Sequence, residues 1–302
     1  MISIIGAGRV GSASAFNIMR MRIADVTLID VQEGLAQGEA LDLEQASPAI
    51  EFDGKIKGSS NFADIAGSEL VIVTAGLSRK PGGSRLDLAK GNAEIVSKIV
   101  PKIVKHAPNS KIMMVTNPVD LLTYLAYKKS GFERTKVFGM SGILDALRYR
   151  SYIALELCVS REDVRGLVIG EHGDRMIPLV DYTTVSGIPV KTLLSGEKIK
   201  RIVQKTRSSG MDVISLKGGT VHAPASVIAI MADAVIRGRN RVIGCSVIPN
   251  GEYHLKDIAV CLPAVIGKNG VEKIINLELD SATKKQLMDV AASIQSTISQ
   301  IE

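Results

Sequence analysis

The sequence is poor in the aromatic residues that many binding surfaces use. Its 302 residues include no tryptophan, and aromatic residues account for only 4% of the chain. The net charge is +6, but Lys and Arg are scattered and are not interleaved with aromatic side chains, so we expect no nucleic-acid partner. No apolar run approaches the roughly 18 residues that a membrane-spanning helix requires, so we expect no membrane partner either.

The sequence also has few cysteines, and no basic segment stands ahead of its first apolar run. Cys158, Cys245 and Cys261 lie in apolar segments without a C-x-x-C spacing, which predicts reduced core residues rather than disulfides. Cys and His side chains do not cluster in the sequence, so we predict no metal site. The first residues, MISIIGAG, become glycine-rich without a preceding basic segment, which does not fit a secretory signal. We therefore expect a cytoplasmic protein.

The composition is that of a globular chain, with 46% hydrophobic and 23% charged residues. Its length exceeds the size at which single cores stop growing, which predicts two domains. Strand-length apolar runs at residues 70–76, 111–118 and 136–140 alternate with helical patterns. This alternation predicts an α/β fold for residues 1–140, a Rossmann-type doubly wound parallel sheet that binds ligands beyond the carboxyl ends of its strands.

A dinucleotide-binding pattern opens the chain. Gly6, Gly8 and Gly11 form G-x-G-x-x-G between an apolar run and a helical segment, and Asp30 ends a second apolar run 19 residues after the last glycine. The three glycines allow a tight turn, a close approach of the pyrophosphate and close helix packing. Asp30 is expected to bind the adenosine ribose and to repel a 2′-phosphate, which predicts NAD rather than NADP as the cofactor.

The pattern changes after residue 140. Helices are expected at 144–157 and 197–210, with a turn-rich connection between them at 189–196. Apolar runs at 242–248, 257–266 and 271–277 are separated by short turn segments, which predicts an antiparallel meander. Residues 141–302 are therefore expected to form an α+β substrate domain.

Residues 167–179 contain the most informative histidine. An apolar run ends at Gly170, and His172 follows between acidic and glycine residues. Because a histidine titrates near neutral pH, it can donate or accept a proton at the end of this buried strand. A turn histidine that bonds only to its neighbours is the alternative. Asp145 and Arg148 are three residues apart on one predicted helix face, as a site pair or a surface salt bridge.

The loop at 76–88 carries Arg79, Lys80 and Arg85 around Pro81 and two glycines. This combination of one stiff position and two permissive ones suits a positively charged lid over an anionic substrate. The alternative is an ordinary solvated basic loop. Arg79 and Asn117 both follow strand ends, where ligands of such sheets bind.

Several motifs together resemble the lactate/malate dehydrogenase family over nearly the whole chain. They are GAGRVG, LID, SRKPGGSR, VTNPVD, GILDALR and IGEHGD, in family order. The resemblance implies that His172 is the proton donor and acceptor, oriented by Asp145. It implies that Arg148 binds the substrate carboxylate, that Arg85 polarises the carbonyl, and that Asn117 contacts substrate and nicotinamide. The cofactor contacts that it implies are Gly6, Ala7, Gly8, Arg9, Val10, Gly11, Asp30, Thr74, Ala75, Gly76, Asn92, Val115 and Asn117.

The resemblance also implies a substrate. In this family an arginine at the position of Arg79 meets the second carboxylate of oxaloacetate, where lactate enzymes have glutamine, so NAD-dependent malate dehydrogenase activity is expected. Gly83 departs from the methionine often found in the malate-type loop. The segment 35–46 resembles a subunit-interface helix, which implies a homo-oligomer, a homotetramer or a homodimer.

Three alternatives remain open at this stage. The first is a lactate or other 2-hydroxyacid dehydrogenase. The second is a redox-inactive protein that binds NAD but lacks the chemistry. The third is the NAD- and metal-dependent glycosidase branch that shares this architecture, although its clustered metal ligands are not evident in the sequence.

Overall fold

The computed structural model describes residues 1–78 and 85–301. The first half forms a parallel sheet whose strands are buried on both faces, as their continuous apolar sequences require. Two of the strands, β1 and β4, are neighbours at the point where the strand order reverses, so the sheet is doubly wound as predicted. The strand order is β3 (Ile56–Ser59), β2 (Val26–Ile29), β1 (Ile2–Ile5), β4 (Leu70–Val73), β5 (Lys111–Met114) and β6 (Val137–Gly139).

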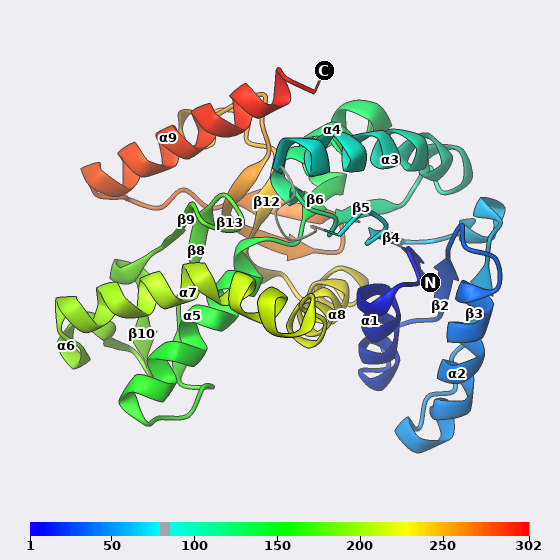
Figure 1. The fold of residues 1–302 in the computed structure, drawn as a ribbon, viewed down its shortest axis with the longest axis horizontal. Helices are drawn as coiled ribbons and strands as arrows, with labels where there is room; N and C mark the ends of the chain where they lie inside the picture. Colours follow the sequence, from blue (N-terminus) through cyan, green and yellow to red (C-terminus); the bar gives the residue numbers. More distant parts are fainter. Residues whose placement is uncertain (79–84, 302) are drawn as a thin grey trace.

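Helices cover both faces of this sheet. In Figure 1, α3 and α4 lie together on one side of the strands, and α1 lies on the other. The helices of this half are α1 (Arg9–Arg20), α2 (Leu35–Ile50), α3 (Arg85–His106) and α4 (Val119–Ser130), with the short 3₁₀ helices η1 (Phe62–Ile65) and η2 (Arg134–Lys136).

The second half extends the same sheet with antiparallel strands. β12 pairs with β6 through Ser246 and Gly139, and the order continues through β13, β8 and β9, while β14 pairs with β13. The predicted meander is therefore present, but it is joined edge to edge to the parallel strands in an 11-stranded sheet. Its strands are β8 (Val168–Gly170), β9 (Met176–Pro178), β12 (Arg241–Val247), β13 (Val260–Gly267) and β14 (Gly270–Ile274).

The other elements of the second half pack beside this sheet. The helix predicted at 197–210 continues to Lys217, and the connection at 189–196 contains the end of a short strand and one helical turn. A small separate sheet has the order β11, β10, β7. The elements are α5 (Gly142–Leu157), β7 (Val164–Arg165), η3 (Val180–Tyr182), β10 (Thr184–Val185), β11 (Ile188–Pro189), α6 (Val190–Leu193), α7 (Gly196–Lys217), α8 (His222–Ile236), η4 (Glu252–His254) and α9 (Ser281–Ile298).

Helix α8 belongs to the second half of the sequence but packs on the first. It is apolar around most of its circumference and lies against α1, as Figure 1 shows. At its end the Arg237 guanidinium donates to the carbonyls of Met21 and Arg22, at 3.0 and 2.6 Å. One hydrophobic core therefore contains residues from both halves of the chain.

The cysteines only partly follow the prediction. Cys245 and Cys261 are buried, and burial raises the pKa of both thiols far above the ordinary value. Cys158 is exposed, and it ends α5 in a left-handed conformation (φ 54°). Across the described residues, no helix is long and apolar enough to cross a membrane.

Candidate active site

His172 lies in the turn that joins β8 to β9, where its imidazole meets the first turn of α5. Nδ1 of His172 is 2.8 Å from Oδ2 of Asp145. The Asp145 carboxylate has no exposed surface, and 14% of the His172 side chain is exposed. A helix N-terminus stabilises a carboxylate such as that of Asp145. The pair is thus buried at one end and accessible at the other.

Asp145 also binds Arg148, one turn further along α5. Nη1 of Arg148 donates to Oδ1 of Asp145 at 3.1 Å, and only 15% of the arginine side chain is exposed. The three-residue spacing places both side chains on one helix face, as expected. One oxygen of the Asp145 carboxylate therefore orients the imidazole of His172, and the other orients the guanidinium of Arg148. Because all three groups are largely buried, this is not a surface salt bridge.

The environment of His172 favours its charged form. Burial lowers the pKa of the imidazole, and the charge of Asp145 and its hydrogen bond raise it by more, so the net pKa lies above the ordinary value. Arg148 opposes this rise through its positive charge, and Asp120 adds to it through its negative charge. These surroundings therefore stabilise the protonated imidazole relative to that of an ordinary histidine.

Asp120 is part of this group, although sequence reasoning assigned it no role. Its Oδ2 accepts a hydrogen bond from the backbone N–H of His172 at 2.9 Å. Asp120 is in the first turn of α4 and is buried. Burial raises the pKa of this carboxyl to about 6, against the opposing effect of the His172 N–H. The only sequence signal was its place three residues after Asn117 within the VTNPVD motif.

Asn92 connects the ends of two strands. Its Oδ1 accepts from the backbone N–H of Leu77 at 2.6 Å, and its Nδ2 donates to the carbonyls of Leu77 and Asn117, at 3.2 and 2.7 Å. The side chain is completely buried, and both of its donor hydrogens are used. Asn92 therefore fixes the main chain beyond β4 and β5, and its contact with the cofactor stays a prediction.

The other expected cofactor residues gather at the same sheet edge. Thr74 Oγ1 donates to the Gly6 carbonyl at 2.9 Å, and Thr116 Oγ1 donates to the Ala75 carbonyl at 2.7 Å. Val115 is buried directly after β5. These bonds join the glycine-rich turn after β1 to the ends of β4 and β5.

The turn after β1 fits a dinucleotide. A Cβ added to Gly11 would lie 1.9 Å from the Gly6 carbonyl oxygen, whereas one added to Gly8 would meet no protein atom within 4 Å. A glycine is therefore needed at position 11 for packing, whereas Gly8 faces open space at the start of α1. The N–H groups of a first helical turn lack intrahelical partners, and no acidic side chain lies in this one, so it suits a pyrophosphate.

Asp30 lies beside this turn at the end of β2. Its Oδ2 accepts from the Ala7 N–H at 2.8 Å, and its Oδ1 accepts from the Gln32 N–H at 2.9 Å. The carboxylate therefore already supports the glycine-rich turn, and it remains partly exposed for a ribose hydroxyl. The residues at this edge fit the adenosine half of NAD.

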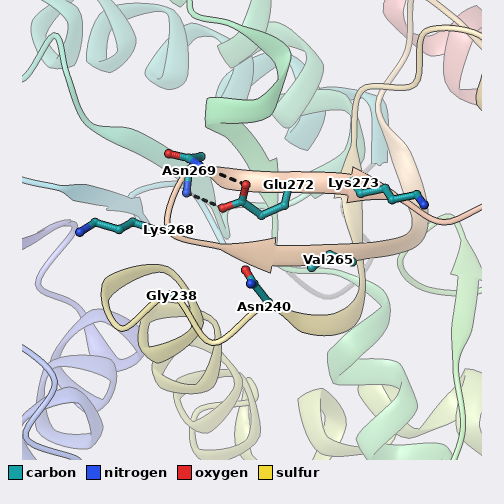
Figure 2. A pocket seen from close by; sticks show the side chains of 7 residues that line it. All are labelled: Gly238, Asn240, Val265, Lys268, Asn269, Glu272 and Lys273. Carbon is teal, nitrogen blue, oxygen red and sulfur yellow. Dashed lines mark hydrogen bonds between the residues drawn. The ribbon is translucent and has the colours of Figure 1, made fainter.

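Part of the predicted basic lid cannot be compared with the structure. Arg79, Lys80 and Gly83 lie outside the described residues, and so does the side chain of Arg85, whose backbone begins α3. A surface hollow at the β13–β14 turn, shown in Figure 2, is lined by Asn240, Lys268 and Glu272 among others, and none of the predicted site residues lines it.

Comparison with known proteins decides the family. The model of the lactate/malate dehydrogenase NAD binding domain matches residues 1–139, and that of the lactate/malate dehydrogenase alpha/beta C-terminal domain matches residues 143–302. The chain belongs to the lactate/malate dehydrogenase family. Its first 139 residues match the part of the family that binds NAD.

Other lactate/malate dehydrogenase family members are similar over their full length. The malate dehydrogenase of Methanosarcina barkeri is 44% identical over 100% of this chain and 99% of its own. That of Bacillus subtilis is 42% identical, over 98% and 96%. The structure of malate dehydrogenase from Salinibacter ruber has a TM-score of 0.95 at 38% identity, covering 99% of this chain and 97% of that one. A Cryptosporidium parvum lactate dehydrogenase, complexed with lactic acid and cofactor, has a TM-score of 0.96 at 34% identity, with the same coverage.

Proposed function

We propose that this chain is an NAD-dependent malate dehydrogenase that interconverts malate and oxaloacetate. The single observation that carries the proposal is the Asp145 carboxylate, which holds His172 with one oxygen and Arg148 with the other. A 2-oxo acid needs both a proton donor for its ketone and a cation for its carboxylate. Full-length relatives named malate dehydrogenase support the same conclusion.

His172 is the acid and base of this proposal. Because Nδ1 donates to Asp145, Nε2 is the nitrogen that faces the substrate. NADH supplies the hydride when it is bound. In oxaloacetate reduction His172 gives its Nε2 proton to the ketone oxygen, and in malate oxidation it takes the hydroxyl proton. The raised pKa of the imidazole favours the donor form. Asp145 stabilises the positive charge that the ring carries before reduction and gains in oxidation.

The arginines hold the dicarboxylate. Arg148 binds the carboxylate next to the ketone with the guanidinium nitrogens that Asp145 does not use. Arg85 polarises the ketone oxygen, Asn117 contacts the substrate, and Arg79 meets the second carboxylate. Because that last contact is absent with pyruvate, Arg79 favours oxaloacetate.

We propose further that residues 1–140 form the dinucleotide-binding domain, which also supplies Arg79, Arg85 and Asn117 to the substrate. Residues 141–302 form the substrate and catalytic domain, which supplies Asp145, Arg148 and His172. The protein acts as a homotetramer or a homodimer in the cytoplasm, with helix α2 at a subunit interface. Sedimentation at several protein concentrations tests the oligomer, and an exposed leucine of α2, Leu41, is the residue to replace with Glu in a variant that should dissociate.

Steady-state assays with oxaloacetate and pyruvate, each with NADH and NADPH, test the function. We expect oxaloacetate with NADH to be preferred. In Arg79→Gln, losing a charged hydrogen bond worth roughly 1.5 to 3 kcal/mol should reduce the preference for oxaloacetate over pyruvate by about tenfold or more. A wild-type preference for pyruvate would indicate a lactate-type enzyme. NADH binding without turnover of any 2-oxo acid would indicate a redox-inactive binding protein.

A further inference from the structure

His172 is held by two aspartates, and the mechanism above uses only one of them. Asp145 binds the imidazole, and Asp120 binds the backbone N–H of the same residue at 2.9 Å. Both aspartates lie in the first turn of a helix, α5 and α4 respectively, and both are buried. The ring and the main chain of His172 are therefore fixed by separate helices.

The positions of Asp120 and Asn117 are both set by the start of helix α4. Helix α4 begins at Val119, directly after Asn117 and Pro118, so its first turn carries Asp120 just beyond Asn117, the proposed substrate contact. The Asn117 carbonyl is itself held by Asn92 at 2.7 Å. Through Asp120, this rigid strand–helix junction reaches across to the β8–β9 turn, which is separated from it by 52 residues of sequence.

A buried carboxyl is costly to keep unless it serves a specific bond. Among the described residues, Oδ1 of Asp120 is buried without a hydrogen bond, while Oδ2 binds His172. The Ser246 hydroxyl is also buried and lies near enough to favour the charged form of the carboxyl. The bond to His172 is thus the directed interaction of this side chain.

We propose that Asp120 is a positioning residue for the reaction. It holds the main chain of His172 so that the imidazole keeps its position relative to Asn117. It touches neither substrate nor cofactor, and it acts by accepting one hydrogen bond. This inference rests on the proposed function, because His172 is the acid and base only in that proposal.

Two shape-matched variants separate the hydrogen bond from the charge. Asp120→Asn removes the charge but keeps an oxygen that can accept from the His172 N–H, with its amide group facing the Ser246 hydroxyl. Asp120→Leu removes both the charge and the acceptor in a similar volume. Ser246→Ala is the matched control, since it alters the buried neighbour of Asp120 and leaves the bond to His172 intact.

We expect kcat for oxaloacetate reduction to fall by about 30-fold or more in Asp120→Leu, because small misplacements of a reacting group cost about 10²-fold. Asp120→Asn should keep kcat within about threefold of the wild type because its acceptor remains, and Ser246→Ala should do the same. KM for oxaloacetate should change little, since Arg148 is held independently. NADH affinity, measured by the fluorescence of NADH itself, should be unchanged in all three variants.

A second readout does not depend on activity. The chain has four histidines, so nitrogen-labelled histidine gives a short amide spectrum in which His172→Asn identifies the His172 signal. Its amide should be protected from hydrogen exchange in wild type and Asp120→Asn and should exchange rapidly in Asp120→Leu. Should Asp120→Leu not fold, the wild type decides: rapid exchange of its His172 amide overturns the proposal.

Equal kcat in Asp120→Leu and wild type would overturn the proposal, and so would an equal loss in Asp120→Leu and Asp120→Asn. A loss in Ser246→Ala as large as that in Asp120→Leu would also overturn it, because repacking alone would then account for the effect. If wild-type protein turns over no 2-oxo acid, the proposed function fails, while the exchange result still reports whether Asp120 holds the His172 main chain.

Discussion

Nδ1 of His172 and Oδ2 of Asp145 are 2.8 Å apart, although 27 residues separate them in the chain. The contact joins the first turn of α5 to the turn between two strands of the same sheet. Because Asp145 is completely buried, its charge acts on the imidazole with little screening by water. This one contact controls both the direction in which the ring points and the pH range in which it carries a proton.

Replacing Asp145 with Asn should lower the pKa of His172. Burial lowers that pKa and Asp145 raises it by more, so without the carboxylate the lowering effect of burial and of Arg148 remains. Oxaloacetate reduction needs the imidazolium, so kcat/KM of the wild type should decline as the pH rises through the raised pKa of His172. In the variant the same decline should occur at a lower pH. The check is a pH profile of kcat/KM, with Asp289→Asn on the exposed side of α9 as the control. An unchanged profile would contradict the assigned role of Asp145.

Replacing His172 with Asn should lower kcat by about 10² to 10⁴-fold, the usual contribution of a general acid or base. NADH binding should be retained, because the glycine-rich turn that fits the dinucleotide lies on another strand. The control is His222→Asn, which alters an exposed histidine at the start of α8. Steady-state kinetics and NADH titration measure both effects, and intact turnover in His172→Asn would end the proposal.

Replacing Gly8 with Ala should affect NADH affinity, whereas replacing Gly11 with Ala should affect stability. At Gly8 the added methyl meets no protein atom, so the fold should be retained while NADH affinity falls. At Gly11 it would lie 1.9 Å from the Gly6 carbonyl oxygen, so the turn must shift and the unfolding temperature should drop. Thermal unfolding with and without NADH measures both. Equal NADH affinity in wild type and Gly8→Ala would argue against a pyrophosphate at this position.

Replacing Asp120 with Asn should change how stability depends on pH. The pKa of Asp120 is raised from 3.8 to about 6 in the folded chain, so the folded state binds more protons than the unfolded state between these values. Wild-type stability therefore falls as pH rises through this range, by about 3 kcal/mol for a shift of this size. The variant lacks this loss, so its stability relative to that of the wild type should increase between about pH 4 and pH 6.

Urea unfolding at constant protein concentration measures that difference. Ser246→Ala retains the titrating carboxyl and should keep the wild-type pH dependence. If the free-energy difference between Asp120→Asn and wild type stayed constant across this range, the raised pKa would be wrong.

The periodic parts of the fold were predictable from the sequence, because buried parallel strands and glycine-rich turns leave local signals. The strands at β1, β2 and β4, the glycine spacing and the i, i+3 pair of Asp145 and Arg148 are of this kind. The joining of the meander to β6 was not, because an edge-to-edge pairing through Ser246 and Gly139 depends on segments more than a hundred residues apart.

Contacts that run through the main chain were also hidden from the sequence. Asp120 binds a backbone N–H, which every non-proline residue carries, so its partner cannot be recognised by residue type. The bonds of the Asn92 amide to the main chain at Leu77 and Asn117 are of the same kind. Cys158 is exposed at the left-handed end of α5, although its neighbours in the sequence are apolar.

The packing of α8 against α1 has a practical consequence for anyone dividing this protein. A fragment ending near residue 140 would contain all six parallel strands but would leave uncovered the surface of α1 on which α8 lies, and it would lose the anchor that Arg237 makes to Met21 and Arg22. Such a fragment should be poorly folded and prone to aggregation, so NAD affinity is better measured on the intact polypeptide than on its amino-terminal half.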